Sequence, residues 1–184
     1  MSLYEKFDSA AMTATNKLVM AWNWTTGRTK SDLANSLVYF GGAAIPAGSF
    51  IRDSLIGGAI LSLFYLPLSV MLTKRNKQVE STESSALERG LKDLRVEKIK
   101  ESYGQTGLVF TLGGSTQLLS DPLSAGDYCS FAGIEAIALA HYVMRADCLP
   151  PRKNVLSRAA DSLKEAIQQP ALQTVPIKLN YSGD

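Results

Sequence analysis

Two long apolar stretches early in the chain are separated by a very short polar link. Residues 33–51 and 54–72 carry no charged side chain, and only Arg52 and Asp53 lie between them. Nineteen helical residues reach about 28 Å, close to the roughly 30 Å of the hydrocarbon core of a membrane. Each stretch contains a proline, which transmembrane helices tolerate when neighbouring groups satisfy the freed carbonyl. The pattern predicts a first transmembrane hairpin over residues 33–73.

A second and more polar pair of apolar stretches follows later in the chain. Residues 105–120 carry no charge but are diluted by Ser, Thr, Gln and Gly, and residues 128–144 are interrupted by Glu135 and His141. We predict a second transmembrane hairpin over residues 105–145. Its first segment is the weaker candidate for a full span, and a re-entrant or interfacial position is the alternative for it.

Amphipathic patterns flank both hairpins. Apolar side chains recur at spacings of three and four in residues 3–22 and 154–169, which predicts helices in the N-terminal segment 1–32 and the C-terminal segment 146–184. The charged segment 74–104 has a similar stripe, so we expect a third amphipathic helix between the hairpins. The expected stripes are Leu3, Phe7, Ala11, Ala14, Leu18 and Trp22, then Leu87, Leu91, Leu94 and Ile99, and finally Leu156, Ala160, Leu163 and Ile167.

Local signals set the expected limits of the central amphipathic helix. Ser85 and Glu88 have the spacing of a capping box, which begins a helix, and Gly104 is a residue that ends one. The helix is expected to lie on the membrane surface, to dock a partner helix, or to pack with the two terminal amphipathic helices into a polar layer.

The basic residues are segregated to alternate connections between the four predicted spans. Residues 1–32 hold four of the nineteen Lys and Arg residues, 74–101 hold eight, and 145–184 hold six. The remaining one is Arg52, and the link at 120–127 contains none. By the positive-inside rule, both termini are expected on the cytoplasmic side of a membrane, or on the matrix-equivalent side in an organelle.

Composition limits the alternatives. The mean hydropathy of +0.01 requires the apolar residues to be confined to parts of the chain. A net charge of +2 is too small to indicate a nucleic-acid partner, and two cysteines with one histidine form neither a disulfide framework nor a multi-histidine site. The predicted class is therefore all-α: a polytopic membrane protein with about four transmembrane helices in two hairpins, plus three amphipathic helices.

Small residues recur within the predicted spans at spacings that suit close packing of helices. Small residues four apart let transmembrane backbones approach each other, and none of the Gly-Gly pairs has the context of a nucleotide-binding loop. The motifs LVYFGG at 37–42 and LVFTLGG at 108–114 also suggest that one hairpin duplicates the other. The candidate packing residues are Gly41, Gly42, Ala44, Gly48, Gly57, Gly58, Ser62, Gly113, Gly114, Ala132, Ala136 and Ala140.

Glu135 and His141 form a candidate intramembrane polar site. An ionisable side chain inside a span is costly, which makes a proton relay or an ion contact the functional hypothesis. The two residues are six positions apart, about 120° around a helix, so the spacing places them on different faces. The structural interpretation, which we favour, is that Glu135 is protonated or paired within the bundle and that His141 reaches the interface.

The sequence contains no other reactive constellation, so we predict no catalytic residue, no metal site, no cofactor and no enzymatic activity. The expected function is a structural or accessory subunit of a larger membrane protein complex. The expected partners are the lipid bilayer and other membrane subunits or further copies of the chain, with no nucleic acid. The alternatives are a small ion or proton transporter or channel using Glu135 and His141, and a soluble helical binding module.

Overall fold

The computed structural model describes residues 3–52, 54–89, 94–117, 124–147 and 155–168. These residues are almost entirely helical, and no β-strand occurs among them, which confirms the predicted all-α class. The helices in this part of the chain are α1 (Leu3–Thr26), α2 (Lys30–Ile51), α3 (Leu55–Glu88), α4 (Leu94–Gln117), α5 (Ala125–Arg145) and α6 (Val155–Gln168).

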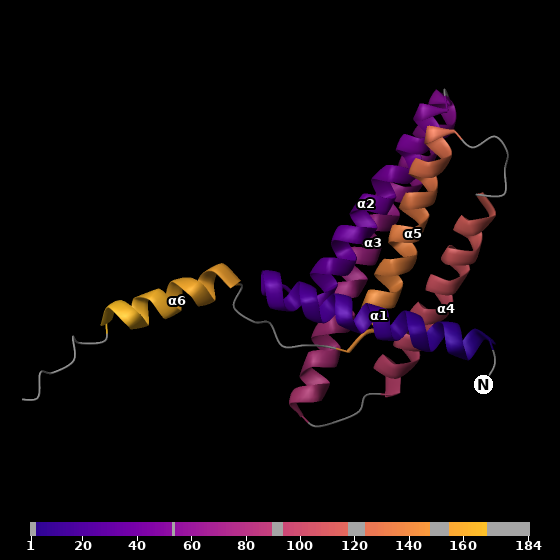
Figure 1. Ribbon diagram of the computed structural model, residues 1–184. Helices are drawn as coiled ribbons and strands as arrows, with labels where there is room; N and C mark the ends of the chain where they lie inside the picture. Colours follow the sequence, from indigo (N-terminus) through magenta and orange to yellow (C-terminus); the bar gives the residue numbers. More distant parts are fainter. Residues whose placement is uncertain (1–2, 53, 90–93, 118–123, 148–154, 169–184) are drawn as a thin grey trace, which may run out of the picture.

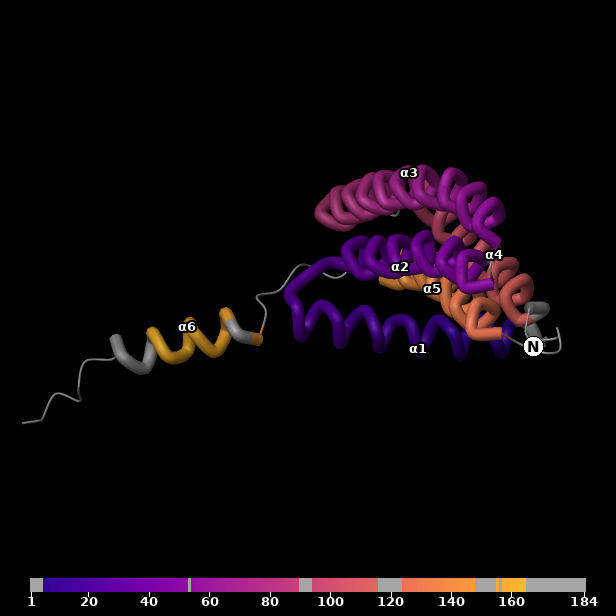
Figure 2. Tube along the Cα trace, turned by 90° about the horizontal axis from the view of Figure 1, so that it is seen from above, coloured from indigo at the N-terminus to yellow at the C-terminus, as the bar shows by residue number. Residues whose placement is uncertain are grey.

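Two antiparallel hairpins, α2–α3 and α4–α5, form a bundle. α2 and α5 pack against each other in its centre, with α3 packed on α2 and α4 packed on α5 (Figure 1). α1 crosses one end of the bundle and contacts α5 and α2, whereas α6 lies apart from it (Figure 2). We call the end that α1 crosses the α1 end, and the opposite end, where α5 begins, the distal end.

Short polar side chains begin the helices. The Oγ atom of Ser124 accepts the N–H of Asp127 at 3.2 Å, and the carboxylate of Asp127 accepts the N–H of Ser124 at 2.8 Å, which forms a capping box at the start of α5. At the start of α2, the N–H of Thr29 donates to Asp32 at 3.3 Å. α2 therefore begins three residues before the predicted apolar segment.

A cluster of buried apolar side chains lies where α1 and the bundle helices converge. It explains why α1 docks at this end, since Val19 of α1 is 1 % exposed there. The cluster comprises Val19, Leu33, Ala34, Val38, Val79, Tyr103, Ala140, Val143, Met144 and Ala146.

The predicted central amphipathic helix does not exist as a separate element. α3 continues to Glu88 and α4 begins at Leu94, so the expected stripe is divided between two helices. Ser85 lies inside α3, where its hydroxyl donates to the carbonyl of Thr82 at 3.0 Å, and Gly104 lies inside α4. No proline interrupts residues 73–88, so the apolar helix extends into the polar segment.

Only Trp22 of the predicted apolar stripe of α1 packs against the buried cluster, and the rest of the side that faces the bundle comes from other residues. Phe7 and Leu18 are exposed, whereas Thr15, Val19 and Asn23 are buried. The hydroxyl of Thr15 donates to a carbonyl of its own helix at 2.7 Å, which lets a polar side chain face the bundle without an unsatisfied donor. α1 therefore keeps much of its apolar stripe on the outside of the molecule.

The C-terminal helix was predicted correctly as α6, although its apolar side is not covered. Ala160 and Leu163, from the predicted stripe, are exposed. The side chains of Leu156 and Ile167, and all of Leu91 from the central stripe, lie outside the described residues. α6 is connected to α1 through Arg158, whose guanidinium lies 4.9 Å from the ring centroid of Trp24.

The outer surface of the distal half of the bundle is apolar. Among the helices in the described residues, only α3 is long and apolar enough to cross a membrane, and only 11 % of its apolar window is buried. The prediction of four spans is therefore not confirmed. The exposed large apolar side chains of α2 and of α3 as far as Met71, which we call the apolar face, are Tyr39, Phe40, Phe50, Ile51, Leu55, Ile56, Ile60, Leu63, Phe64, Leu66, Leu68, Val70 and Met71.

Candidate functional site

A lysine is buried at the α1 end of the bundle. The Lys30 side chain has 0 % of its surface exposed, and its Nζ donates to Glu83 of α3 at 2.6 Å. The same atom donates to the carbonyls of Met144 at 3.3 Å and Ala146 at 2.5 Å, where α5 ends. An ammonium has three N–H donors, so each has an acceptor here. The positive charge also faces the negative end of the α5 dipole.

Glu83 extends this site to α4. Its second carboxylate oxygen, Oε1, accepts from Lys100 of α4 at 3.1 Å. We call Lys30, Glu83 and Lys100 the lysine–glutamate cluster. It connects α2, α3 and α4 through side chains, and it connects α5 through the backbone carbonyls that Lys30 contacts.

A chain of neutral hydrogen bonds lies beside the lysine–glutamate cluster. Asn76 of α3 donates to Asn35 of α2 at 3.1 Å and accepts from the hydroxyl of Tyr103 of α4 at 2.9 Å. Burial raises the pKa of Tyr103, and the Arg75 guanidinium, 5.5 Å from the ring centroid, opposes this rise. The phenol therefore stays neutral at pH 7 and remains a donor to Asn76.

His141 of α5 packs against this chain in the interior. Its Nδ1 lies 2.7 Å from the carbonyl oxygen of Ile137 in its own helix. Its ring stacks on Phe110, with centroids 5.6 Å apart, and meets Tyr103 at an interplanar angle of 56°. His141 is 5 % exposed, so the structure places it inside the bundle rather than at an interface.

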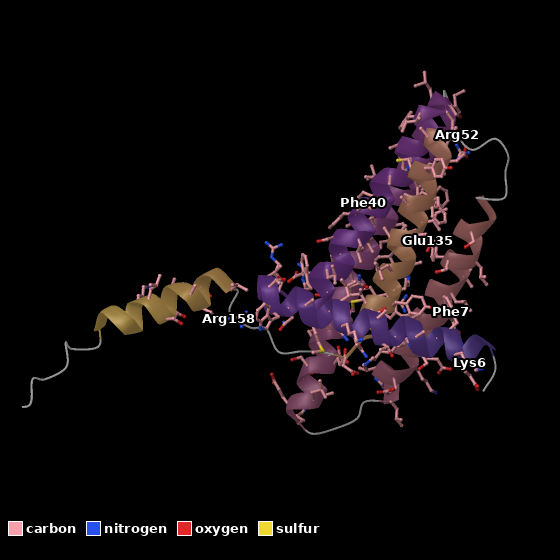
Figure 3. The ribbon with its side chains drawn as sticks, viewed as in Figure 1. Lys6, Phe7, Phe40, Arg52, Glu135 and Arg158 are labelled. Atoms are coloured by element: carbon pink, nitrogen blue, oxygen red, sulfur yellow. The ribbon has the colours of Figure 1, made fainter. Side chains whose placement is uncertain are left out.

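Glu135 lies half-buried between α5 and α4 (Figure 3). Its Oε1 atom is buried and has no hydrogen-bond partner among the described residues. A Cβ atom built at Gly114 of α4 would lie 2.6 Å from this oxygen. Glycine at position 114 therefore provides the room that the carboxyl group occupies.

The structure does not bring Glu135 and His141 together, although both face α4. Glu135 lies next to Gly114, whereas His141 lies next to Phe110 and Tyr103. A packed face of a helix spans 100° or more, so two residues about 120° apart lie at its two edges. His141 occupies the edge inside the bundle, and Glu135 occupies the outer edge.

Glycines bring the backbones of α2 and α5 into contact. Gly41 and Gly48 are seven residues apart in α2, and Gly126 and Gly133 are seven apart in the antiparallel α5. A Cβ at Gly41 would lie 2.5 Å from the carbonyl oxygen of Gly133, and one at either Gly48 or Gly126 would overlap the carbonyl oxygen of the other. Seven residues make about two turns, so these glycines form one line, which we call the glycine seam.

Other predicted packing residues lie within the hairpins. Gly42 faces α3, where a Cβ would overlap Ser69, and Gly114 faces α5 beside Glu135. These two glycines end the similar motifs LVYFGG and LVFTLGG, and each faces the other helix of its own hairpin. A Cβ at Gly58 would lie 2.5 Å from the ring of Phe50.

The remaining predicted packing residues differ in burial. Ala44, Ala136 and Ala140 are buried, and Gly57 lies beside Ser54 at the start of α3. Ser62 is half-buried, and its hydroxyl donates to a carbonyl of its own helix at 2.8 Å. Ala132 is exposed, and a Cβ at Gly113 would meet no atom within 4 Å. The structure therefore gives these last two positions no part in helix packing.

Several residues of the site were missed from the sequence. The missed glycines are Gly107, Gly126 and Gly133. The seven-residue spacings of Gly107 with Gly114 and of Gly126 with Gly133 were the available signal for them. A Cβ at Gly107 would lie 3.1 Å from the ring of Tyr142, which shows close packing of α4 on α5. Lys30 and Glu83 had no such signal, because nothing local distinguishes them from the other charged residues of their segments.

An ion pair joins the two hairpins at the distal end. Arg52, at the end of α2, lies 2.6 Å from the carboxylate of Asp127 at the start of α5. Hydrogen bonds from the hydroxyl and N–H of Ser124 lower the pKa of Asp127, and the charge of Arg52 lowers it further. Asp127 is therefore ionised at neutral pH and pairs with the arginine.

Comparisons with known proteins give no family for this chain: no family model matches it, and no curated protein or solved structure is significantly similar to it. Among the described residues, no group of three or more His, Cys, Asp or Glu side chains is placed to hold a metal ion. The features of the described residues that bear on function are the buried polar groups, the glycine seam and the apolar face.

Replacing Gly48 by alanine is expected to destabilise the protein by about 1–3 kcal/mol, because the added methyl group overpacks the glycine seam. The matched control is Gly113→Ala, where the methyl group meets open space and alanine favours the helix by up to about 1 kcal/mol. Equilibrium unfolding of the purified protein, followed by circular dichroism, measures both. Equal stability of the two variants would contradict the close α2–α5 contact.

Replacing Glu83 by glutamine is expected to destabilise the protein by about 3 kcal/mol, because it leaves the buried Lys30 ammonium without a counter-charge. Glu97→Gln makes the same chemical change on an exposed side chain, and we expect a shift within about 0.5 kcal/mol. The same unfolding measurement applies. A Glu83→Gln variant as stable as Glu97→Gln would show that the lysine–glutamate cluster does not hold the helices together.

Proposed function

We propose that the protein is embedded in a membrane through α2 to α5, as two transmembrane hairpins, and serves as a structural or accessory subunit of a larger membrane complex. The observation that carries this proposal is the apolar face. Its Leu63 and Phe64 are 77 % and 74 % exposed, in a helix whose apolar window is 11 % buried. The core helix of a water-soluble protein with this composition would instead be mostly buried.

The energetic cost of the apolar face in water supports a lipid environment. Burying a large apolar side chain is worth about 1.5–3 kcal/mol, and soluble monomers rarely expose continuous apolar patches above a few hundred Å². α4 and α5 add exposed Val109, Leu112 and Tyr128 on the other hairpin. Lipid tails solvate such side chains, so the bundle needs no further protein to cover them.

The distribution of charge supports one orientation of the bundle in the membrane. Residues 33–51 and 54–72 carry no charge, and the basic residues of 74–88 and 94–101 lie on the parts of α3 and α4 nearer the α1 end. α1 crosses the bundle at this end, with Phe7 on its distal side and Lys6 on the opposite side (Figure 3). An amphipathic helix at a membrane surface has this arrangement. We therefore place both the α1 end and α6 on the cytoplasmic or matrix-equivalent side.

The subunit role is supported by apolar surface on α6, which lies outside the four helices proposed to be embedded in the membrane. α6 lies away from the bundle and exposes Ala160 and Leu163 on one side. An amphipathic helix with an uncovered apolar side is a docking element for a groove on another protein. Because α2 and α5 fill the centre of the bundle along the glycine seam, α3 and α4 lie on its outside. Their outward-facing surfaces are available to neighbouring subunits.

The first test uses cell membranes washed with alkaline carbonate, followed by extraction in a mild detergent and a native gel. The chain should stay with the membranes and should migrate with a mass well above its 19.9 kDa. The Leu163→Gln variant should stay in the membrane but lose the larger species, whereas Lys164→Gln should behave as the unchanged protein. Release by carbonate would instead establish a soluble binding module, and migration of the unchanged protein as a monomer would refute the subunit role.

A second candidate function, ion or proton transport, is favoured by one observation. The buried Oε1 of Glu135 lacks a partner among the described residues, at the interface of α4 and α5. Membrane-embedded carboxyl groups of this kind serve as proton or ion sites in transporters. His141 has no contact with Glu135 in the structure, so this function depends on Glu135 alone.

The Glu135→Gln variant tests transport directly. Liposomes containing the unchanged protein should dissipate a proton or cation gradient at least about tenfold faster than liposomes with Glu135→Gln. The amide cannot pass on a proton as a carboxyl group does, and it has no negative charge to bind a cation. A fluorescent pH indicator inside the liposomes measures proton flux, and an ion-selective dye measures cations. Equal leakage from both preparations and from empty liposomes would exclude transport and leave the subunit role unaffected.

A further inference from the structure

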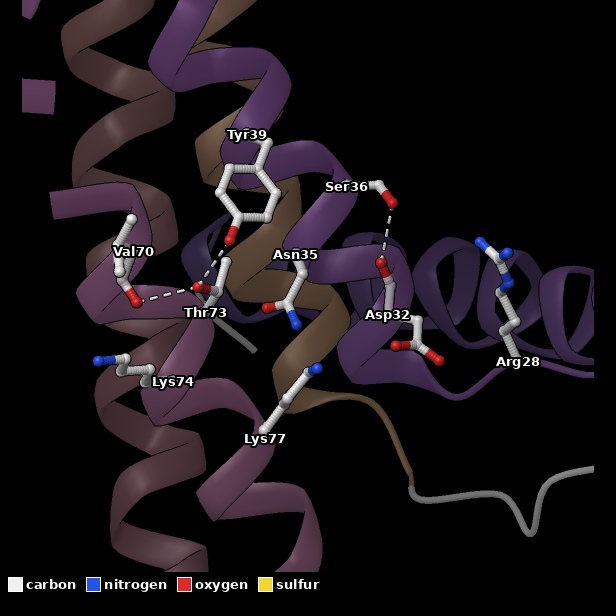
Figure 4. A pocket seen from close by; sticks show the side chains of 9 residues that line it. All are labelled: Arg28, Asp32, Asn35, Ser36, Tyr39, Val70, Thr73, Lys74 and Lys77. Carbon is white, nitrogen blue, oxygen red and sulfur yellow. Dashed lines mark hydrogen bonds between the residues drawn. The ribbon is translucent and has the colours of Figure 1, made fainter. Parts of the chain in front are cut away.

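A groove of about 380 Å³ lies on the outer surface between the start of α2 and the middle of α3 (Figure 4). Tyr39 and Val70 lie in the upper part of the groove, Lys74 and Lys77 lie below them along α3, and Arg28 lies at the opposite edge, beyond Asp32. The cations are Arg28 from the loop before α2, and Lys74 and Lys77 from α3. The groove therefore combines an apolar end with a basic end.

The three cations have no ion pair with any carboxylate of the described residues. This distinguishes them from Lys30, Lys100, Arg52 and Arg145, which are all paired. All three are also exposed. Three cations that line one groove without forming an ion pair among the described residues give it a positive potential for an anionic ligand.

The carboxylates nearest the groove are engaged elsewhere. Asp32, which lines the groove, accepts the N–H of Thr29 at 3.3 Å, and Glu80 of α3 accepts the N–H of Ser31 at 3.4 Å. Both carboxylates thus face the positive end of the α2 dipole, which offsets part of their negative charge. They reduce the positive potential of the groove without forming an ion pair with its lysines.

The groove also offers neutral hydrogen-bonding groups and a fixed shape. The hydroxyls of Tyr39 and Thr73 lie 3.3 Å apart across the groove, and the hydroxyl of Ser36 lies at its edge. Arg28 is held by the preceding turn, in which Gly27 has a φ of 71° and Asn23 donates to the carbonyl of Arg28 at 3.2 Å. The loop that carries the cation is therefore anchored to α1.

The apolar end of the groove continues into the apolar face. Val70 and Tyr39 both line the groove and are both exposed, and Phe40 and Met71 are exposed beside them in the chain. In the orientation proposed above, the basic end of the groove lies at the cytoplasmic surface and its apolar end enters the hydrocarbon region. This arrangement matches a phospholipid, which has a charged phosphate joined to acyl chains.

We propose that this groove binds the phosphate headgroup of one anionic phospholipid, with Arg28, Lys74 and Lys77 around the phosphate and the acyl chains along α2 and α3. The inference rests on the membrane embedding proposed above. The Tyr39 hydroxyl can turn from Thr73 to donate to a phosphate or glycerol oxygen, whereas the hydroxyls of Thr73 and Ser36 already donate to carbonyls of their own helices at 2.9 Å. A lipid bound here would fix the depth of α3 in the bilayer.

The test titrates the full chain, purified in detergent, with phosphatidylglycerol, phosphatidylcholine or inorganic phosphate, and counts bound molecules by native mass spectrometry. Each basic residue near the surface contributes roughly fivefold in affinity, so the variant R28Q/K74Q/K77Q should bind phosphatidylglycerol on the order of 100-fold more weakly. The control K6Q/K17Q/K98Q removes the same charge from exposed positions outside the groove and should bind within about threefold of the unchanged protein. Circular dichroism verifies that both variants are folded.

The outcomes separate the ligand sources. Binding of one phosphatidylglycerol that inorganic phosphate at millimolar concentration does not displace supports the lipid site. Equal binding of phosphatidylcholine, equal losses in the two triple variants, or phosphate binding as tight as lipid binding would each overturn it. Release of the chain from membranes by carbonate would refute the embedding itself, whereas loss of lipid selectivity in a chain that stays embedded would refute this inference alone.

Discussion

The buried Lys30 ammonium is the interaction on which the arrangement of the helices depends. Moving a charge out of water costs several kcal/mol, and this cost is recovered only when every donor has an acceptor. Lys30 meets this condition with the Glu83 carboxylate and two carbonyls at the end of α5. Because these acceptors come from different helices, the lysine is satisfied only when α2, α3 and α5 are correctly aligned. Lys100 then fixes α4 through the same carboxylate.

The two ends of the bundle use different physical means to hold the same helices together. At the α1 end, charged and amide side chains join the helices through hydrogen bonds in a buried environment. Toward the distal end, α2 and α5 approach through the glycine seam, and Arg52 pairs with Asp127 across the hairpin tips. Close backbone contact suits a helix pair in lipid, where burial of apolar surface gives no driving force between helices.

This division explains why both the polar site and the groove lie where they do. Charged residues of the bundle are concentrated at the α1 end, so the boundary between basic and apolar surface falls along the middle of α3, near Val70 and Lys74. The groove lies at this boundary. Glu135 lies on the other side of the bundle. Between Asp127 and Arg145, the only other acidic or basic side chain of α5 is His141. The carboxyl group there is accommodated by Gly114 rather than by a charged partner.

Local patterns in the sequence determined the helical class, the position of the apolar segments and the amphipathic character of both terminal helices, because these follow from spacings of a few residues. The sequence did not show that α3 continues to Glu88, since the tertiary partners of Asn76 and Glu83 stabilise this polar extension. It also did not show that Thr15, Val19 and Asn23 lie on the side of α1 that packs on the bundle. The pairing of Gly41 with Gly133 and of Lys30 with Glu83 was decided only by the tertiary structure, because each contact joins residues far apart in the chain whose side chains look ordinary in their own segments.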